Sequence, residues 1–103
     1  MDITKLMKQA QKMQKQVQDA QSQLANRTVE AVIAGGKVTV VATGAGDITS
    51  IKIAKDVVDP EDVEMLEDLV LTGVKQAIEK GRDLAASEMK KVTGGIGLPG
   101  MGF

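Results

Sequence analysis

Four lysines near the N-terminus are spaced so that their side chains could bind anions together. They follow one another at steps of 3, 4 and 3 residues, and no acidic residue lies between Thr4 and Gln18 to offset them. Residues spaced in this way lie on one side of an α-helix. A row of ammonium groups on a helix can contact the phosphates of a nucleic acid. This lysine row consists of Lys5, Lys8, Lys12 and Lys15.

A solvated helix face is the other interpretation of the lysine row. Cations in the first half of a helix oppose the helix dipole, at a cost of roughly a few tenths of a kcal/mol each. A helix tuned only for its own stability would carry acids there, as Glu61 and Asp62 do further along the chain. The glutamines beside the lysine row can also donate to phosphate oxygens. The spacing alone leaves both interpretations open.

Groups that could perform catalysis are scarce. The chain has no His, Cys or Tyr, so the usual general bases and soft metal ligands are absent, and its serines have no imidazole to activate them. One acidic cluster could suggest a divalent-cation site, but it lacks the ligand spacing and glycine turn of a calcium loop. A solvated helix face is the favoured interpretation of that cluster: Glu61, Asp62, Glu64, Glu67 and Asp68. The sequence predicts a binding protein and not an enzyme, with no cofactor, metal or small-molecule substrate.

The lysine row belongs to a predicted N-terminal helix. Apolar residues recur there at alternating steps of 3 and 4, which is a heptad pattern. With Asp2 as N-cap, this predicts a helix over 2–25, in which the periodic part from Ile3 to Leu24 is about 33 Å long. The lysine row lies on the opposite side of that helix from the apolar residues. This apolar seam consists of Ile3, Leu6, Ala10, Met13, Val17, Ala20 and Leu24.

Three short segments rich in Val, Ile and Thr follow the helix. They cover 28–34, 37–43 and 47–54, and glycine-containing turns at 35–36 and 44–46 separate them. Alternating apolar residues place Val38 with Val40, and Ile51 with Ile53, on common faces. Short connections between consecutive strands predict an antiparallel three-stranded meander.

A second long helix is predicted over 60–92. Asp59 is its expected N-cap and Pro60 its first residue. Gly73 and Gly81 lie inside it and predict either a bend or a close helix contact. At about 50 Å the helix would overhang a compact domain of this size, whose diameter is about 34 Å. We therefore expect a homodimer that covers its apolar stripe, with a kink at one of the glycines as the alternative.

The chain as a whole is predicted to be one α+β domain over 1–93, with α-β-β-β-α order and a flexible glycine-rich tail over 94–103. The N-terminus lacks the apolar core of a signal peptide. Apolar runs of about four residues are far too short for a bilayer span of roughly 20. These features predict a cytoplasmic protein that binds no membrane. Because the net charge is −1, any nucleic-acid surface must come from local separation of charge.

Four stretches resemble the YbaB/EbfC family of nucleoid-associated proteins, in the right order and over nearly the whole chain. They are LMKQAQKMQ, KVTVVATGAGDITSIKI, EMLEDLV and GLPGMGF. The resemblance implies a homodimer of α-β-β-β-α subunits whose helices project like the arms of tweezers. It also implies non-enzymatic binding of double-stranded DNA in the bacterial nucleoid, with effects on gene expression. In that family the helical arms grip DNA, and the matching positions here are the lysine row together with Lys90 and Lys91.

The amino-acid composition also indicates which parts of the DNA the protein would contact. Phe103 is the only aromatic residue, which argues against stacking on single-stranded bases. No helix-turn-helix or zinc-finger pattern is present to read base edges. Contacts to backbone phosphates with weak sequence preference are therefore expected. The competing hypothesis is a helical clamp or adaptor that grips a protein partner through an apolar tip, for which Met7 and Met13 are candidates.

Overall fold

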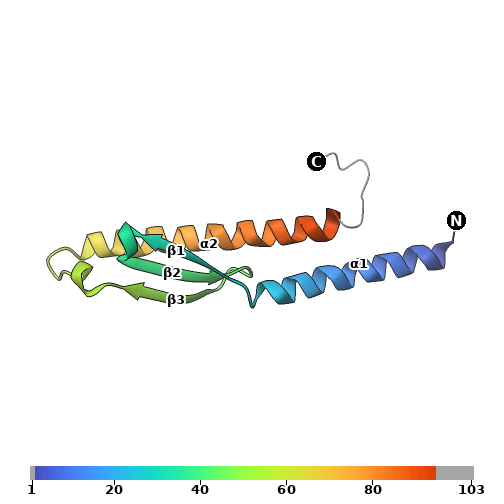
Figure 1. Cartoon of the computed structure of the whole chain (residues 1–103), viewed down its shortest axis with the longest axis horizontal. Coiled ribbons are helices and arrows are strands. Elements are labelled where there is room, and N and C mark those ends of the chain that lie inside the picture. The colour runs from blue at the N-terminus through green and yellow to red at the C-terminus, as the bar shows by residue number, and fades with distance from the viewer. Residues whose placement is uncertain (1, 95–103) are drawn as a thin grey trace.

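The computed structural model describes residues 2–94, and the predicted tail beyond Gly94 lies outside them. The chain folds as a three-stranded antiparallel sheet preceded and followed in the sequence by a long helix, which confirms the predicted α-β-β-β-α subunit; α2 packs along the sheet and α1 projects from one end of it (Figure 1). Two short 3₁₀ helices, η1 (Ala34–Gly36) and η2 (Lys55–Val57), join consecutive elements. The main elements are α1 (Ile3–Leu24), β1 (Thr28–Ile33), β2 (Val38–Thr43), β3 (Ile48–Ile53) and α2 (Val63–Gly94).

The three strands pair with one another in the order β1-β2-β3. Across it, Ile33 pairs with Val38 and Val38 with Ile53. The turn between β1 and β2 requires the left-handed backbone conformation at three successive residues, with φ of 53° at Ala34, 67° at Gly35 and 98° at Gly36. Glycine adopts this conformation without steric cost, so the sequence suits the backbone at Gly35 and Gly36.

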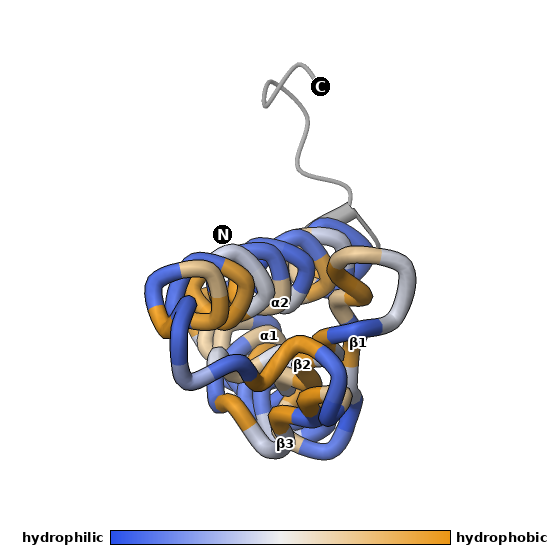
Figure 2. Tube along the Cα trace, turned by 90° about the vertical axis from the view of Figure 1, so that its left-hand side faces the viewer, coloured by the Kyte–Doolittle hydropathy of each residue, from blue (hydrophilic) through white to orange (hydrophobic). Residues whose placement is uncertain are grey.

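The hydrophobic core lies between α2 and the first two strands. Val38, Val40 and Ala42 project from β2 toward α2 and are completely buried, as are Ala31 of β1 and Ala77 of α2. Figure 2 views the molecule along its long axis and shows β3 as the strand furthest from α2. The helix therefore covers β1 and β2 and leaves much of β3 open.

Gly73 and Gly81 bring α2 unusually close to the sheet. A Cβ atom at Gly73 would lie 2.7 Å from Cγ2 of Val40, and one at Gly81 would lie 2.6 Å from the carbonyl oxygen of Thr43. The helix continues without interruption through both positions. The kink that would have folded it back is therefore wrong, and the close-contact alternative is the correct one.

The start of α2 differs from the prediction. Asp59 and Pro60 belong to a turn, in which the Asp59 carboxylate accepts from the Glu61 amide (2.9 Å) and its carbonyl accepts from the Asp62 amide (3.0 Å). The helix begins at Val63, and the Asp62 carboxylate accepts from the Met65 amide at 3.3 Å. Proline after aspartate suits the second position of a β-turn as well as it suits the first helical residue. The second aspartate then takes the capping role.

The outer edge of β1 has a charged neighbour. The Lys80 ammonium group, on α2, donates to the carbonyl oxygen of Glu30 at 2.9 Å. Because β1 is an edge strand, this contact occupies a main-chain acceptor at the border of the sheet.

The molecule is elongated, with principal extents of 71 × 25 × 17 Å. Its radius of gyration is 19.7 Å, against about 13 Å for a compact chain of this length. Several large apolar side chains on this elongated body are exposed, among them Ile3, Val32 and Leu71.

Candidate nucleic-acid interface

The base of α1 is anchored on the turn between β2 and β3. Leu24, the last residue of the helix, is buried, and a Cβ atom at Gly44 would lie 2.7 Å from its Cδ2. The Gly44 amide donates to the carbonyl oxygens of Leu24 and Arg27, each at 3.0 Å. Only a residue without a side chain can approach the end of α1 this closely, so Gly44 fixes where the helix leaves the body of the protein.

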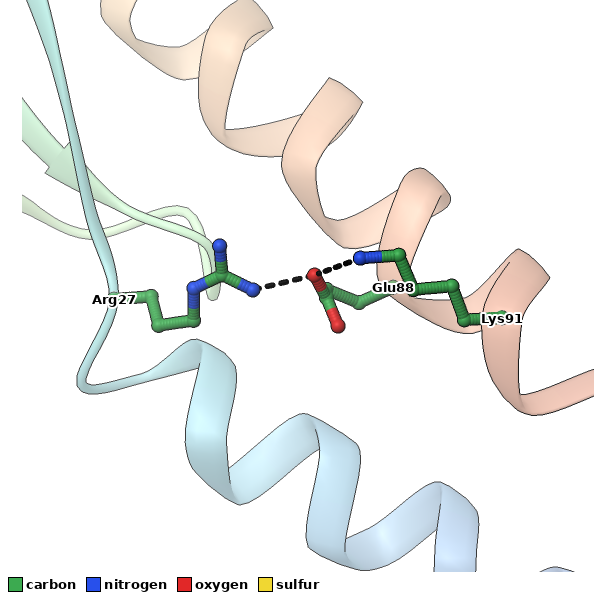
Figure 3. Close-up of polar contacts among 3 residues, drawn as sticks. All are labelled: Arg27, Glu88 and Lys91. Carbon is green, nitrogen blue, oxygen red and sulfur yellow. Dashed lines mark hydrogen bonds and ion pairs between the residues drawn. The ribbon is translucent and has the colours of Figure 1, made fainter.

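An ion-pair cluster joins this base to α2. Arg27 and Lys91 both donate to the same carboxylate oxygen of Glu88, with Lys91 at 3.4 Å (Figure 3). The hydrogen bond from Arg27 lowers the pKa of the Glu88 carboxyl below its ordinary value, although desolvation opposes the shift. Sequence reasoning missed Arg27 because its partner lies 61 positions away and no local pattern links the two.

The inner half of the apolar seam packs toward α2. Met13, Val17 and Ala20 are half-buried and Leu24 is buried. A groove of about 360 Å³ beside this contact shows that the end of α2 lies next to the middle of α1. Its lining comes from both helices: Gln16, Asp19, Ala20, Gln23, Glu88, Lys91 and Val92.

The outer half of α1 extends past the end of α2 as an arm (Figure 1). Along it the apolar seam has little cover from the described residues, and Ile3 and Leu6 are 70% and 47% exposed. Asp2 caps the helix at its tip by accepting from the amides of Thr4 and Lys5, at 3.0 and 3.4 Å. The arm is therefore a regular helix to its end, which holds its side chains at fixed spacing.

The lysine row lies along this arm. All four side chains are exposed, and within residues 2–94 none of their ammonium groups makes a hydrogen bond or an ion pair. From Lys5 to Lys15 the row extends about 15 Å. Phosphates on one DNA strand are spaced about 3.4 Å apart along the duplex axis, so a row of this length could lie beside about four of them.

The two C-terminal candidates occupy a different setting. Lys90 and Lys91 are exposed near the end of α2, but Lys91 contacts the Glu88 carboxylate and lines a groove with Asp19. Neighbouring acids offset its charge. The lysine row on α1 is therefore the stronger candidate for contact with an anion.

Charge is separated along the length of the molecule. Every charged residue from Asp56 to Asp68 is acidic, and this segment lies at the end of the molecule opposite the arm (Figure 1). The separation explains how a chain with a net charge of −1 can carry a basic arm. Among the described residues, no cluster of three or more acids is arranged to hold a metal ion. No helix within residues 2–94 combines the length and apolar character needed to cross a membrane.

Comparison with known proteins agrees with this arrangement. The model of the YbaB/EbfC DNA-binding family matches residues 1–96. A protein named nucleoid-associated protein from Clostridium kluyveri is 57% identical over 100 residues, covering 97% of this chain and 88% of its own length. One of the same name from Ruminiclostridium cellulolyticum is 54% identical over 101 residues, with the same shares covered.

A crystal structure supports the fold. An uncharacterized protein of Helicobacter pylori superposes with a TM-score of 0.68 at 19% sequence identity, covering 93% of this chain and 97% of that one. The family model and the two relatives confirm the resemblance inferred from the sequence. The chain belongs to the YbaB/EbfC DNA-binding family.

Proposed function

We propose that this protein binds double-stranded DNA mainly through backbone phosphates, with the lysine row on α1 as the principal contact and Lys90 and Lys91 as a secondary one. Through this binding it influences nucleoid organisation and gene expression, and it resides in the cytoplasm at the nucleoid. The observation that carries the proposal is a row of four exposed lysines on a helical arm, whose ammonium groups pair with nothing among residues 2–94, in a member of a DNA-binding family.

Contact with phosphates suits these residues better than contact with bases. A lysine ammonium group is a flexible point charge, which follows phosphate positions without reading a base edge. Phe103 is the only aromatic residue in the chain, so the arm has no ring on which a base could stack. The expected binding is therefore strongly salt-dependent and only weakly dependent on DNA sequence.

We further propose that the functional unit is a homodimer that meets at β3. Ile51 and Ile53 pair across the sheet with Val40 and Val38, which are completely buried beneath α2. The two isoleucines lie on the same sheet face but remain 44% and 39% exposed. A second copy over β3 would cover this apolar surface. It would also supply a second arm, which doubles the phosphates that one assembly can contact.

A protein clamp remains a second candidate because the arm also has an apolar aspect. Met7 is 58% exposed, and on the helix it is the i,i+4 neighbour of the exposed Ile3. An arm that grips a protein partner would use these side chains and leave the lysine row in solvent. Binding of that kind changes little with salt, whereas binding to phosphates weakens steeply.

The test is duplex DNA binding across a salt series for the wild type and a Lys8/Lys12/Lys15→Gln variant. The slope of log affinity against log salt should shrink by about 0.9 for each phosphate that a lysine no longer neutralises. The matched control is Lys55/Lys75/Arg82→Gln, which removes the same charge from exposed basic residues that lie outside both the arm and β3. Its slope should stay near that of the wild type.

Equal reductions in both variants would mean that net charge, and not the lysine row, determines binding. An unchanged slope in the α1 variant would place the DNA surface elsewhere. Absence of binding by the wild type at low salt would refute the DNA proposal and favour the protein clamp.

A further inference from the structure

The side of α1 that carries the lysine row continues toward the body of the protein. Counting on from Lys15, Asp19 and Gln23 follow at steps of four residues, so they lie on the same side of the helix. Both line the groove of about 360 Å³ that α1 forms with the end of α2. Gln23 lies about 12 Å beyond Lys15 along the helix axis. A DNA backbone that follows the lysine row would therefore arrive at this groove.

Two cations meet at Glu88, which also lines the groove. The Arg27 guanidinium group, from the link between α1 and β1, and the Lys91 ammonium group, from α2, donate to the same oxygen of Glu88 (Figure 3). The side chains of Arg27 and Lys91 are 50% and 71% exposed, whereas that of Glu88 is 22% exposed. Since the acid is the least accessible of the three, an anion that arrives from solvent would meet the cations first.

The contact with Glu88 uses only part of the hydrogen-bonding capacity of Arg27. A guanidinium group carries its N–H donors in a rigid fork that matches two oxygens at once. Within residues 2–94, the side-chain hydrogen bond of Arg27 runs from Nη1 alone to a single carboxylate oxygen. A phosphodiester offers two free oxygens to the same fork. A phosphate therefore suits the Arg27 side chain better than the Glu88 carboxylate does in this arrangement.

We propose that Arg27 and Lys91 bind phosphates of DNA at this groove, in competition with the Glu88 carboxylate that holds them in the protein without DNA. The inference rests on the proposed function, because it extends the same DNA contact from the arm to its base. It adds Arg27 to the contact surface, and it makes Glu88 an internal anion that lowers the affinity for DNA. The contact then runs from Lys5 to Gln23, about 27 Å along α1.

The ion pair can be broken from either side, and the two changes should affect binding of duplex DNA in opposite directions. Arg27→Gln removes a cation, so the slope of log affinity against log salt should shrink by about 0.9. Glu88→Gln removes the competing anion and keeps both cations, so the affinity should rise, by up to about fivefold. If the pair only holds the arm in place, both variants break it and both should weaken binding alike.

Each variant has a control with the same change of charge elsewhere on α2. Arg82→Gln matches Arg27→Gln and should keep the wild-type slope, and Glu79→Gln matches Glu88→Gln and should raise the affinity less; both side chains are exposed. Melting temperatures are measured first, so that binding is compared only between folded proteins. Lys91→Gln leaves the pair between Arg27 and Glu88 intact and should also reduce the slope, which keeps the test valid if Arg27→Gln does not fold.

The outcomes separate this inference from the proposed function. Weaker binding by Glu88→Gln, or wild-type slopes in Arg27→Gln and Lys91→Gln, would overturn the inference and leave the lysine row as the DNA contact. A reduced slope in Arg27→Gln together with an unchanged slope in Lys8/Lys12/Lys15→Gln would support the inference and move the main contact to the base of the arm. Absence of wild-type binding at low salt would refute both.

Discussion

Arg27 pairs with Glu88 across the junction at which α1 leaves the body of the protein (Figure 3). Arg27 lies between α1 and β1, whereas Glu88 lies on α2, one helical turn before Lys91. Together with the contact between Leu24 and Gly44, the ion pair holds the base of the arm at two points on different elements. The direction of the arm is thus determined by tertiary contacts as well as by the connecting chain.

This ion pair gives a pH dependence with a definite sign. The pKa of Glu88 is lower in the folded protein because Arg27 donates to its carboxylate. Its contribution to stability is therefore complete above the unfolded pKa of about 4.3, and it is lost as the pH falls through the folded value. Asp56, whose pKa is lowered by a hydrogen bond from Lys37, adds a contribution of the same sign.

We expect Glu88→Gln to remove part of the dependence of folding stability on pH. Melting temperatures measured from about pH 7 to pH 3 should differ between wild type and variant at neutral pH and converge in acid. Glu79→Gln, an exposed change on the same helix, is the control and should follow the wild type. Parallel curves for wild type and Glu88→Gln would show that ionisation of Glu88 contributes nothing to the pH dependence of stability.

Gly81→Ala should destabilise the protein although alanine is the better helix former. The new Cβ would lie 2.6 Å from the Thr43 carbonyl oxygen, and main chain cannot move aside as a side-chain end can. We expect a loss of about 1 to 3 kcal/mol in urea unfolding, which exceeds the gain of about 1 kcal/mol in helix propensity. Ser87→Ala, on an exposed face of α2, should be neutral or slightly stabilising. A stabilised Gly81→Ala would mean that α2 does not approach the sheet this closely.

Leu24→Ala should loosen the base of the arm. Its buried side chain fills the corner between α1 and Gly44, and its removal should lower stability by about 2 to 3 kcal/mol. Val32→Ala, which removes an exposed side chain, serves as the control and should change stability little. Amide exchange in α1 should rise more than exchange in β2. A uniform rise across the protein would mean that the arm and the body unfold as one unit.

Ile51→Asp should convert the proposed dimer to a monomer. The carboxylate would lie on the open sheet face over β3, where a partner copy would have to desolvate it. Sedimentation at micromolar concentration should then give the mass of one chain, whereas Val32→Asp should keep the mass of two. Val32 is a suitable comparison because it is 54% exposed and lies on β1, at the far side of the sheet. Dissociation in Val32→Asp alone would move the interface to β1.

Local sequence patterns predicted the elements well, because helix periodicity, strand alternation and turn glycines act over a few residues. They failed at the start of α2, where Asp59 and Asp62 are equally good caps and only the turn decides between them. The sequence could not decide between a bend and a close contact at Gly81. That choice depends on which part of the fold packs against the helix at this position. The alternation of apolar residues along β3 predicted the sheet face on which Ile51 lies. It could not predict that α2 leaves this part of the face uncovered.

Local sequence patterns likewise predicted only part of the candidate site. The heptad offset predicted that the lysine row and the apolar seam lie on opposite sides of one helix. The ion pair between Arg27 and Glu88, which holds the arm in place, is a long-range contact that no local pattern encodes. That the lysine row contacts DNA stays a prediction until the salt series is measured.

The contact between Lys80 and Glu30 has a consequence for self-association. An unprotected edge strand is a template on which further chains can add, and repeated addition produces fibres. A lysine at the β1 border makes that edge a poor template, because an incoming strand would have to bury the charge. If two copies meet at β3 as proposed, growth from the β3 side ends at the dimer. We therefore expect the chain to remain free of amyloid-like filaments when concentrated, and Lys80→Val to lose this protection in a dye-binding assay.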